Sequence, residues 1–407
     1  MQTKLTAELA KTRQGQEADA ILRSCVHCGF CTATCPTYQL LGDERDGPRG
    51  RIYLIKQVLE GAEPTRETQL HLDRCLTCRA CETTCPSGVQ YGRLADIGRE
   101  HIEEKVSRPF SETLLRKILL HTVPYPKRIG TLIKAGNLFR PLLPAALKDK
   151  LAPVTKAGPW PTAKHQRSML VLAGCVQSVS TPSTNQAAAT VLDRLGITLL
   201  QAPEAGCCGA LSHHLSAAEQ TRQHIKQNID AWWPYIEQGA EAIIITASGC
   251  GTMVKEYGHL LRDDAEYADK AARVSALAKD IVEVMQAEIA DGNWSNLGHS
   301  QSIAFQCPCT LQHGQQLAGQ VENLLQRVGF VLTPVQDAHL CCGSAGTYSI
   351  LQPKLSQQLR ANKLKALHAG KPERIVSANI GCQMHLSEAD DPIVHWIELI
   401  AEKLPDA

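Results

Sequence analysis

Two twelve-residue runs of the chain, CVHCGFCTATCP at 25–36 and CLTCRACETTCP at 75–86, repeat one cysteine spacing. Each run follows the pattern C-x2-C-x2-C-x3-C and is closed by a proline. A two-residue gap is short enough to wrap consecutive thiolates around one face of an iron–sulfur cubane, and the proline turns the chain away after the last ligand. Eight thiols at this spacing match two 4Fe-4S clusters.

The fourth thiol of each run cannot easily reach the cluster that the first three hold. In the two-cluster ferredoxins that the motif resembles, this thiol crosses to the other cluster. One cluster is therefore expected on Cys25, Cys28, Cys31 and Cys85. The second is expected on Cys75, Cys78, Cys81 and Cys35. Structural zinc is the main alternative, but it needs four ligands per ion and has no use for the third thiol and the x3-C-P ending.

The chain has 17 cysteines among 407 residues, and their clustering bears on where it resides. The first 24 residues lack the charged and then apolar regions of a secretory signal, and no run of about 18 apolar residues is long enough to span a bilayer. We therefore expect a cytoplasmic protein whose membrane contact, if any, is peripheral. In a reducing compartment, clustered cysteines point to metal ligation and not to disulfides.

The segment between the two runs predicts a helix that small ferredoxins lack. GDERDGPRG reads as a loop, and RIYLIKQVLEG reads as an amphipathic helix that ends at Gly61. This arrangement resembles the helical ferredoxin domain of succinate dehydrogenase iron–sulfur subunits. Arg45, Arg49 and Arg51 lie in this segment, and they could meet an acidic partner, compensate charge near the clusters, or simply form a solvated basic loop.

The second half of the chain is an internal duplication. SMLVLAGC, VLDRLGITLLQAPEAGCCG and AEAIIITASGCG recur as SIAFQCPC, LLQRVGFVLTPVQDAHLCCG and ERIVSANIGCQ, with the cysteines at nearly constant separation. Each copy reads as a strand ending in Cys, a helix, a strand, a loop with Cys-Cys-Gly, a helical stretch and a strand ending in Gly-Cys. Ligands of parallel α/β sheets bind beyond the carboxyl ends of the strands, so the thiols of a copy should converge there.

These thiols are the second set of candidate metal ligands. Repeat one offers Cys175, Cys207, Cys208 and Cys250. Repeat two offers Cys307, Cys309, Cys341, Cys342 and Cys382, with His385 nearby. The glycine after each cysteine pair allows the backbone to approach a cluster, with its N–H free to bond to sulfur. Repeat two has more thiols, so we expect it to be the occupied one, while Cys175 could also be an ordinary small buried residue.

The duplicated half resembles the cysteine-rich CCG domain of heterodisulfide reductase, anaerobic glycerol-3-phosphate dehydrogenase, lactate-utilisation proteins and glycolate oxidase. In heterodisulfide reductase-like members each full motif ends in C-x2-C, whereas this chain has CGTM at 250–253 and CQMH at 382–385. This departure leaves three readings open: a third iron–sulfur cluster, zinc in one repeat, or an empty repeat.

A basic segment joins the two halves. Residues 106–150 carry nine Lys or Arg against Glu112 and Asp149, with Leu and Ile at helical spacing. Such a segment could lie on an anionic membrane, pack on a partner subunit, or simply connect domains through a solvated face. Residues 151–167 read as a Pro-rich linker.

The sequence thus predicts an α+β multidomain protein. We expect a helical two-cluster ferredoxin domain at 1–105, the basic segment and linker at 106–167, and α/β CCG units at 168–290 and 300–407. The chain has no G-x-G-x-x-G fingerprint after a strand and no phosphate-binding loop, so it should bind neither a dinucleotide nor a nucleoside triphosphate. Its charge of +1 gives no indication of nucleic-acid binding.

Across its full length the chain resembles the iron–sulfur subunits of bacterial glycolate oxidase. The resemblance rests on CVHCGFCTATCP, CCGSAGTY and ANIGCQMHL. It implies a subunit of an oxidoreductase complex, not catalytic alone, that receives electrons from a flavin-containing partner oxidising glycolate and passes them toward membrane quinone on the cytoplasmic face of the inner membrane. The alternatives are the corresponding subunit of a lactate or anaerobic glycerol-3-phosphate dehydrogenase, a heterodisulfide reductase-like thiol–disulfide enzyme, and a zinc-stabilised scaffold.

Overall fold

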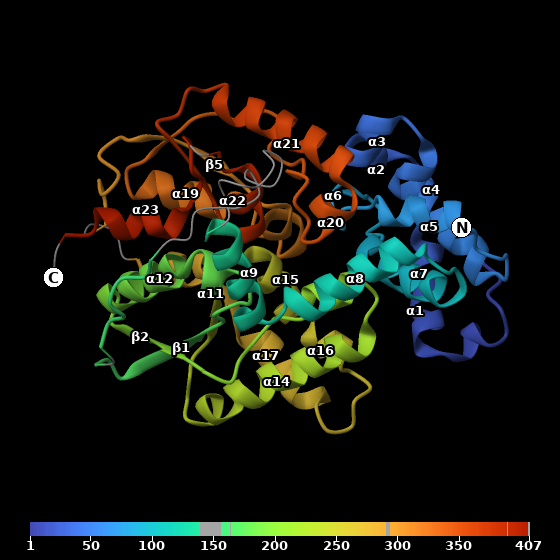
Figure 1. Ribbon diagram of the computed structural model, residues 1–407, viewed down its shortest axis with the longest axis horizontal. Helices are drawn as coiled ribbons and strands as arrows, with labels where there is room; N and C mark the ends of the chain where they lie inside the picture. Colours follow the sequence, from blue (N-terminus) through green and yellow to red (C-terminus); the bar gives the residue numbers. More distant parts are fainter. Residues whose placement is uncertain (139–155, 163, 290–293, 389, 406–407) are drawn as a thin grey trace. The chain divides into compact units, whose positions relative to one another are not determined.

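The computed structural model describes residues 1–138, 156–162, 164–289, 294–388 and 390–405 (Figure 1). It divides into two compact units. Unit 1 comprises residues 1–117, 214–216 and 339–363, and unit 2 comprises residues 118–213, 217–338 and 364–407. Unit 1 thus includes both C-x2-C-x2-C-x3-C runs and also the Cys-Cys-Gly loop of repeat two. Residues 139–150 of the basic segment and 151–155 of the linker lie outside the described residues.

Unit 1 is built from helices around the two cysteine runs. Its elements are η1 (Leu9–Lys11), α1 (Arg13–Ser24), α2 (Phe30–Ala33), α3 (Pro36–Leu41), η2 (Glu44–Asp46), α4 (Pro48–Leu59), α5 (Arg66–Asp73), α6 (Ala80–Thr83), α7 (Tyr91–Lys105), α20 (Tyr348–Leu351) and the first parts of α8 (Phe110–Thr122) and α21 (Pro353–His368). The predicted helix between the runs is α4, which starts at a proline and packs against α7. Near the amino terminus, α1 begins at Arg13, and the Thr12 side chain caps it.

Unit 2 contains two four-stranded parallel sheets, one for each repeat. Repeat one supplies β1 (Arg167–Val171), α11 (Gln177–Ser180), α12 (Pro182–Arg194), β2 (Ile197–Gln201), α13 (Ala210–His214), α14 (Ala218–Glu237), β3 (Ile243–Ile245), α15 (Ser248–Lys255), α16 (Tyr257–Leu260), α17 (Ala268–Leu277), β4 (Ala278–Asp280) and α18 (Ile281–Glu288). Repeat two supplies β5 (Ser302–Gln306), η4 (Thr310–Gly314), α19 (Gln320–Arg327), β6 (Val331–Leu332), β7 (Arg374–Ser377), α22 (Ile380–Leu386), β8 (Val394–His395) and α23 (Trp396–Lys403). Helix α9 (Pro126–Leu138) precedes both.

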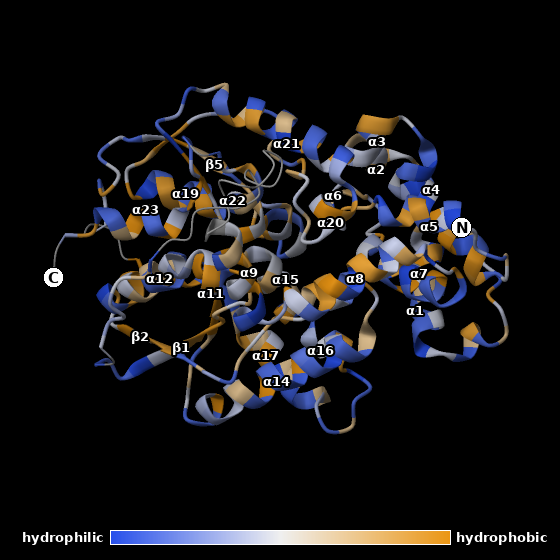
Figure 2. Ribbon diagram, in the orientation of Figure 1, coloured by the Kyte–Doolittle hydropathy of each residue, from blue (hydrophilic) through white to orange (hydrophobic). Residues whose placement is uncertain are grey.

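The two sheets have the same topology, which confirms the duplication. Their strand orders are β2-β1-β3-β4 and β6-β5-β7-β8, and all the pairs are parallel. Each sheet has a fourth strand that sequence reasoning missed, because β4 and β8 are only three and two residues long. Both faces of the first sheet are buried: Met169 and Val171 enter one apolar core, and Leu170 enters another. Figure 2 shows the resulting apolar strands.

The carboxyl ends of the two central strands meet inside unit 2. After β3, the Ser248 N–H donates to the Ala378 carbonyl at 3.1 Å, and the Gly249 N–H donates to the Asn379 side chain at 3.2 Å. The buried His395 ring donates to the Thr246 carbonyl at 2.8 Å. The Gly-Cys positions were expected at strand ends, but Cys250 and Cys382 lie in the first turn of α15 and α22. Ser248 and Gly249, the first two residues of α15, thus bond to repeat two at the end of β3.

The Cys-Cys-Gly loop of repeat one is held by a buried asparagine. The Asn228 side chain of α14 accepts from the Gly206 N–H at 2.8 Å and donates to the Cys207 carbonyl at 2.8 Å. It also donates to the Tyr257 hydroxyl, which in turn donates to the Cys208 carbonyl at 2.8 Å. Asn228 is fully buried, so these loop groups have no water to replace a lost partner.

Replacing Asn228 with alanine should therefore loosen this loop. Each buried loop group left unpaired costs about 1–3 kcal/mol. We expect a lower midpoint of thermal unfolding and faster labelling of Cys207 and Cys208 by a thiol reagent in the metal-free protein. The matched control is Gln227→Ala, which removes one exposed bond to the Glu204 carbonyl and should change stability little. Equal effects of the two substitutions would contradict the role of Asn228.

Candidate functional site

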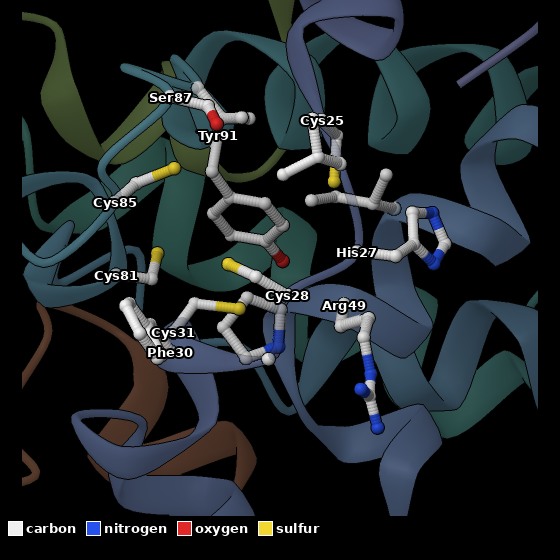
Figure 3. A pocket seen from close by; sticks show the side chains of 15 residues that line it. Cys25, His27, Cys28, Phe30, Cys31, Arg49, Cys81, Cys85, Ser87 and Tyr91 are labelled. Atoms are coloured by element: carbon white, nitrogen blue, oxygen red, sulfur yellow. The ribbon is translucent and has the colours of Figure 1, made fainter.

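The thiols of the first predicted ligand set line one cavity of unit 1. Cys25, Cys28, Cys31 and Cys85 surround about 420 Å³ of space that no protein atom fills, part of it open to solvent. Figure 3 shows these sulfurs, together with that of Cys81, around the ring of Tyr91. The cavity lies near the surface, since Cys28 is exposed and the neighbouring Val26 and Phe30 are 68% and 60% exposed.

The second predicted set lines a second cavity. Cys35, Cys75, Cys78 and Cys81 surround about 300 Å³ of unfilled space. Here Cys35 and Cys81 are buried, and Cys75 and Cys78 are partly covered. Cys81 and Tyr91 line both cavities, so the two spaces are adjacent. The first cavity is lined by three thiols of the first run and by Cys81 and Cys85 of the second, and the second cavity by three thiols of the second run and Cys35 of the first.

The same local backbone turn wraps both runs around their cavities. The third and fifth positions are left-handed in each: His27 and Gly29 have φ of 57° and 86°, and Thr77 and Arg79 have φ of 52° and 59°. This conformation is costly for residues other than glycine and is held only where the surroundings impose it. Only Gly29 gave a sequence signal for this turn, so the strained positions His27, Thr77 and Arg79 were missed.

A cationic network is buried beside the second cavity. Arg51 is 1% exposed and lines the cavity, and its guanidinium donates to the His71 carbonyl at 2.7 Å and to the Thr37 hydroxyl at 3.2 Å. The buried Asp46 carboxylate lies 3.5 Å from Arg51 and 2.8 Å from Arg74. Two guanidinium groups thus share one carboxylate, and one of them, Arg51, is buried beside the thiols. A buried charge of this kind needs a further anion nearby.

The Cys75 thiol is surrounded by groups that favour its anionic form. It accepts from the Thr77 N–H at 3.4 Å and from the Tyr91 hydroxyl at 3.5 Å. Burial opposes ionisation, but Arg51, Arg99 and these two donors together lower the pKa of Cys75. In contrast, burial and the neighbouring thiols raise the pKa of Cys81 well above its usual range. A metal centre would remove that obstacle, because a coordinated thiol is deprotonated.

The three arginines of the segment between the runs have different surroundings. Arg45 is exposed and paired with Asp43 and Glu67. Arg49 is partly exposed, lines the first cavity and pairs with Glu44 at 2.8 Å. Arg51 is buried at the second cavity. Charge compensation near the thiols therefore fits Arg49 and Arg51, and a solvated loop fits Arg45.

The residues of both cavities fit 4Fe-4S clusters. Each cavity offers the four thiols of one predicted set, and the buried cation at the second one matches a ligand that brings negative charge. In the described part of the chain, no three cysteine sulfurs lie within 4.8 Å of one another. A tetrahedral zinc site with Zn–S distances of about 2.3 Å requires sulfurs about 3.8 Å apart. The spacing of the thiols is therefore wider than zinc requires.

All four thiols of repeat one come together in unit 2. Cys175 contacts Cys207, Cys207 contacts Cys208, and Cys208 contacts Cys250 through their side chains. The contact with Cys207 and burial raise the pKa of Cys175 well above its usual range. Cys175 therefore lies among thiols in the loop after β1 and is not simply an isolated buried residue.

The thiols of repeat two are divided between the two units. Cys307, Cys309 and Cys382 belong to unit 2, while Cys341 and Cys342 belong to unit 1. Within unit 1, the buried Tyr348 follows the Cys-Cys-Gly loop and its hydroxyl donates to the Arg74 carbonyl at 3.2 Å, one residue before Cys75. Sequence reasoning missed Tyr348, as it missed Tyr91, because neither belongs to a motif.

The glycines of the two Cys-Cys-Gly loops behave as the sequence predicts. Gly209 and Gly343 have φ of 89° and 90°, where glycine is at no disadvantage. Their N–H groups donate to the sulfurs of Cys207 and Cys341, each at 3.4 Å. The two loops therefore adopt the same turn with one N–H aimed at a thiol.

Comparison with known protein families supports both halves of this description. Residues 21–89 match the 4Fe-4S dicluster domain family, which confirms the prediction of two 4Fe-4S clusters. Residues 169–255 and 303–387 each match the cysteine-rich domain family, which confirms the pair of CCG units. A crystal structure of a hypothetical protein from Helicobacter pylori has a similar fold, with a TM-score of 0.57, 9% identity, and coverage of 96% of this chain and 72% of that chain.

Full-length relatives define the family more narrowly. The glycolate oxidase iron–sulfur subunit of Escherichia coli (strain K12) is 58% identical over 99% of both chains. The probable glycolate oxidase iron–sulfur subunit of Bacillus subtilis (strain 168) is 31% identical over 90% of this chain and 88% of that one. Lactate utilization protein A of Geobacillus thermodenitrificans is 30% identical but matches only 50% of this chain. The chain therefore belongs to the family of glycolate oxidase iron–sulfur subunits.

Proposed function

We propose that this chain is the electron-transfer subunit of a complex that oxidises glycolate to glyoxylate. The observation that carries the proposal is the pair of adjacent cavities, each lined by the four thiols of one predicted ligand set. A bound 4Fe-4S cluster supplies one-electron transfer and no two-electron chemistry of its own. The residues of this chain supply the thiolates, the N–H and hydroxyl donors to them, and the cover that limits water.

The ligand sets that we propose follow the cavities. The exposed cavity takes its cluster on Cys25, Cys28, Cys31 and Cys85. The covered cavity takes its cluster on Cys75, Cys78, Cys81 and Cys35. Cys81 lines both, and the run spacing assigns it to the covered one.

A partner must carry the organic reaction. We propose a flavin-containing subunit, because a flavin can accept two electrons from a hydroxy acid and pass them on one at a time. The similarity to glycolate oxidase subunits supports glycolate as that partner's substrate, and the lower coverage of lactate utilization proteins makes lactate the second candidate.

We also propose that repeat one holds a third metal centre. Its four thiols contact one another in series within unit 2. The similarity to iron–sulfur subunits supports an iron–sulfur centre as the occupant, and zinc is the alternative. The expectation that repeat two is occupied stays a prediction, with Cys307, Cys309, Cys341, Cys342 and Cys382 as its thiols.

Membrane contact is proposed for α8. Phe110, Leu114 and Ile118 follow one stripe of this helix and are 82%, 46% and 50% exposed, with Lys117 beside them. Figure 2 shows this helix with apolar positions along it. Of the basic residues counted in the segment, Arg108 and Arg116 instead pair with the Asp73 carboxylate in unit 1. No helix among the described residues is long and apolar enough to cross a bilayer.

The stripe fits the headgroup region of an anionic membrane, with its apolar side chains inserted and Lys117 at the surface. We therefore propose peripheral attachment at the cytoplasmic face of the inner membrane, where a quinone could accept the electrons.

Substitution of single thiols tests the crossed ligand sets. Cys35→Ser should damage the cluster held by Cys75, Cys78 and Cys81, although Cys35 belongs to the first run. Cys28→Ser should damage the other cluster. Electron paramagnetic resonance of the dithionite-reduced variants, with iron and sulfide analysis, separates the two cases. Loss of the same cluster in both variants would contradict crossing.

The same two variants test the function in the assembled complex. With glycolate as reductant, the partner's flavin should still be reduced, whereas reduction of a quinone analogue should fall at least tenfold. The reason is that the organic step does not need this chain, but the onward transfer does. Unchanged quinone reduction in a variant with one cluster missing would exclude an electron-transfer role for that cluster.

Metal analysis tests the third centre. The double variant Cys207→Ser/Cys208→Ser should contain less iron than the wild type, with the signals of the two ferredoxin clusters unchanged. The matched double variant Cys341→Ser/Cys342→Ser shows what repeat two holds. Equal iron in the wild type and the repeat-one variant would exclude an iron–sulfur centre there, and zinc lost in its place would identify that metal.

Vesicle binding tests the α8 stripe. The chain should co-sediment with vesicles containing phosphatidylglycerol and bind less to pure phosphatidylcholine. Replacing Phe110, Leu114 and Ile118 with serine should weaken this binding at least tenfold, whereas Val331→Ser, at another exposed apolar position, should not. If the triple variant binds vesicles normally but no longer purifies with its partner subunits, the stripe is a protein interface instead.

A further inference from the structure

We propose that Arg51 raises the reduction potential of the cluster held by Cys35, Cys75, Cys78 and Cys81. The inference rests on the proposed function, because it assumes that both clusters are bound. Burial alone would make this cluster hard to reduce, since an added electron increases its negative charge where little water can stabilise it. The surroundings of the covered cavity therefore must supply compensation if the cluster is to accept electrons.

Arg51 is placed to give that compensation. Its side chain is 1% exposed and lines the covered cavity together with Cys35 and Cys75. A guanidinium keeps its positive charge even when buried, so the charge is fixed near the thiols at any working pH. Water screens this charge little, because electrostatic interactions strengthen as the local dielectric constant falls.

The neighbours of Arg51 do not neutralise it. Asp46, at 3.5 Å, is its nearest anion, but the Asp46 carboxylate is also bonded to Arg74 at 2.8 Å and to the His71 ring at 3.0 Å. The remaining partners of Arg51, the His71 carbonyl and the Thr37 hydroxyl, are neutral. The Thr37 hydroxyl also lies 3.3 Å from the Cys35 sulfur, so the network reaches a ligand directly.

The exposed cavity has no equivalent charge. Its arginine, Arg49, is 36% exposed at the side chain and pairs with Glu44 alone at 2.8 Å. Water and Glu44 both screen that charge. The two clusters thus have the same ligand type and different surroundings: Arg51 and Arg79 both line the covered cavity, and Arg51 is the buried one.

The substitution Arg51→Gln tests this role, because it removes the charge while a planar amide can still bond to the His71 carbonyl. Asp46 keeps Arg74 and His71, so no buried carboxylate is left alone. Redox titration followed by electron paramagnetic resonance measures both midpoint potentials. The variant Cys28→Ser, which retains only the covered cluster, assigns the signals. We expect Arg51→Gln to shift the midpoint of the covered cluster downward and to leave that of the exposed cluster unchanged.

Arg45→Gln is the matched control, since it removes an exposed arginine of the same segment and should move neither midpoint. Arg51→Lys keeps the charge without the planar group and should restore most of the wild-type potential. An unshifted covered cluster in Arg51→Gln, or an equal shift of both clusters, would overturn the inference.

If Arg51→Gln loses the covered cluster, the variant Arg51→Lys decides whether Arg51 acts through its charge or only as a structural residue. Retained iron with a near wild-type midpoint supports the role of the charge, and loss of the cluster there too reduces Arg51 to a structural residue and overturns the inference. A wild type without two clusters would instead refute the proposed function itself.

Discussion

Buried thiols that must become anionic together are the constraint on which unit 1 depends. Each cavity brings together the four thiols of one predicted set, which range from the exposed Cys28 to the buried Cys81, and burial together with mutual repulsion holds the pKa of Cys81 high. The chain meets this cost with fixed donors and cations, of which Thr77, Tyr91 and Arg51 are the nearest to Cys75. Folding of unit 1 and cluster binding are therefore coupled, as they are in other metal-dependent domains.

The cysteines of unit 2 are positioned in a different way from those of unit 1. Both faces of its first sheet are buried, and ligand sites of parallel sheets lie beyond the carboxyl ends of the strands. There the two repeats bond to one another through Ser248 and Ala378, which fixes the helices that start at these strand ends. Cys250 and Cys382 lie in the first turns of those helices. The thiols of this unit are thus placed by backbone pairing between repeats, and not by a short contiguous motif.

The sequence predicted what depends on spacing and missed what depends on distant packing. The cysteine runs, the helix α4 and the duplicated sheets were all readable, because each is a local pattern of residue type. The strained positions His27 and Thr77 carried no signal, since a left-handed residue other than glycine is imposed by its surroundings. Asn228 and Tyr348 were also unreadable, because their partners lie far away in sequence and only the fold brings them together.

Duplication and divergence explain why the two cysteine runs have different environments. The two runs adopt the same turn, so the difference must come from residues outside them. The segment between the runs supplies Arg49 to one cavity and Arg51 to the other, two residues apart on α4 and therefore on different faces of that helix. One arginine remains in contact with water and the other is enclosed. A single helix thus gives two copies of one motif unequal electrostatic surroundings. Two identical clusters in identical surroundings would not differ in this way.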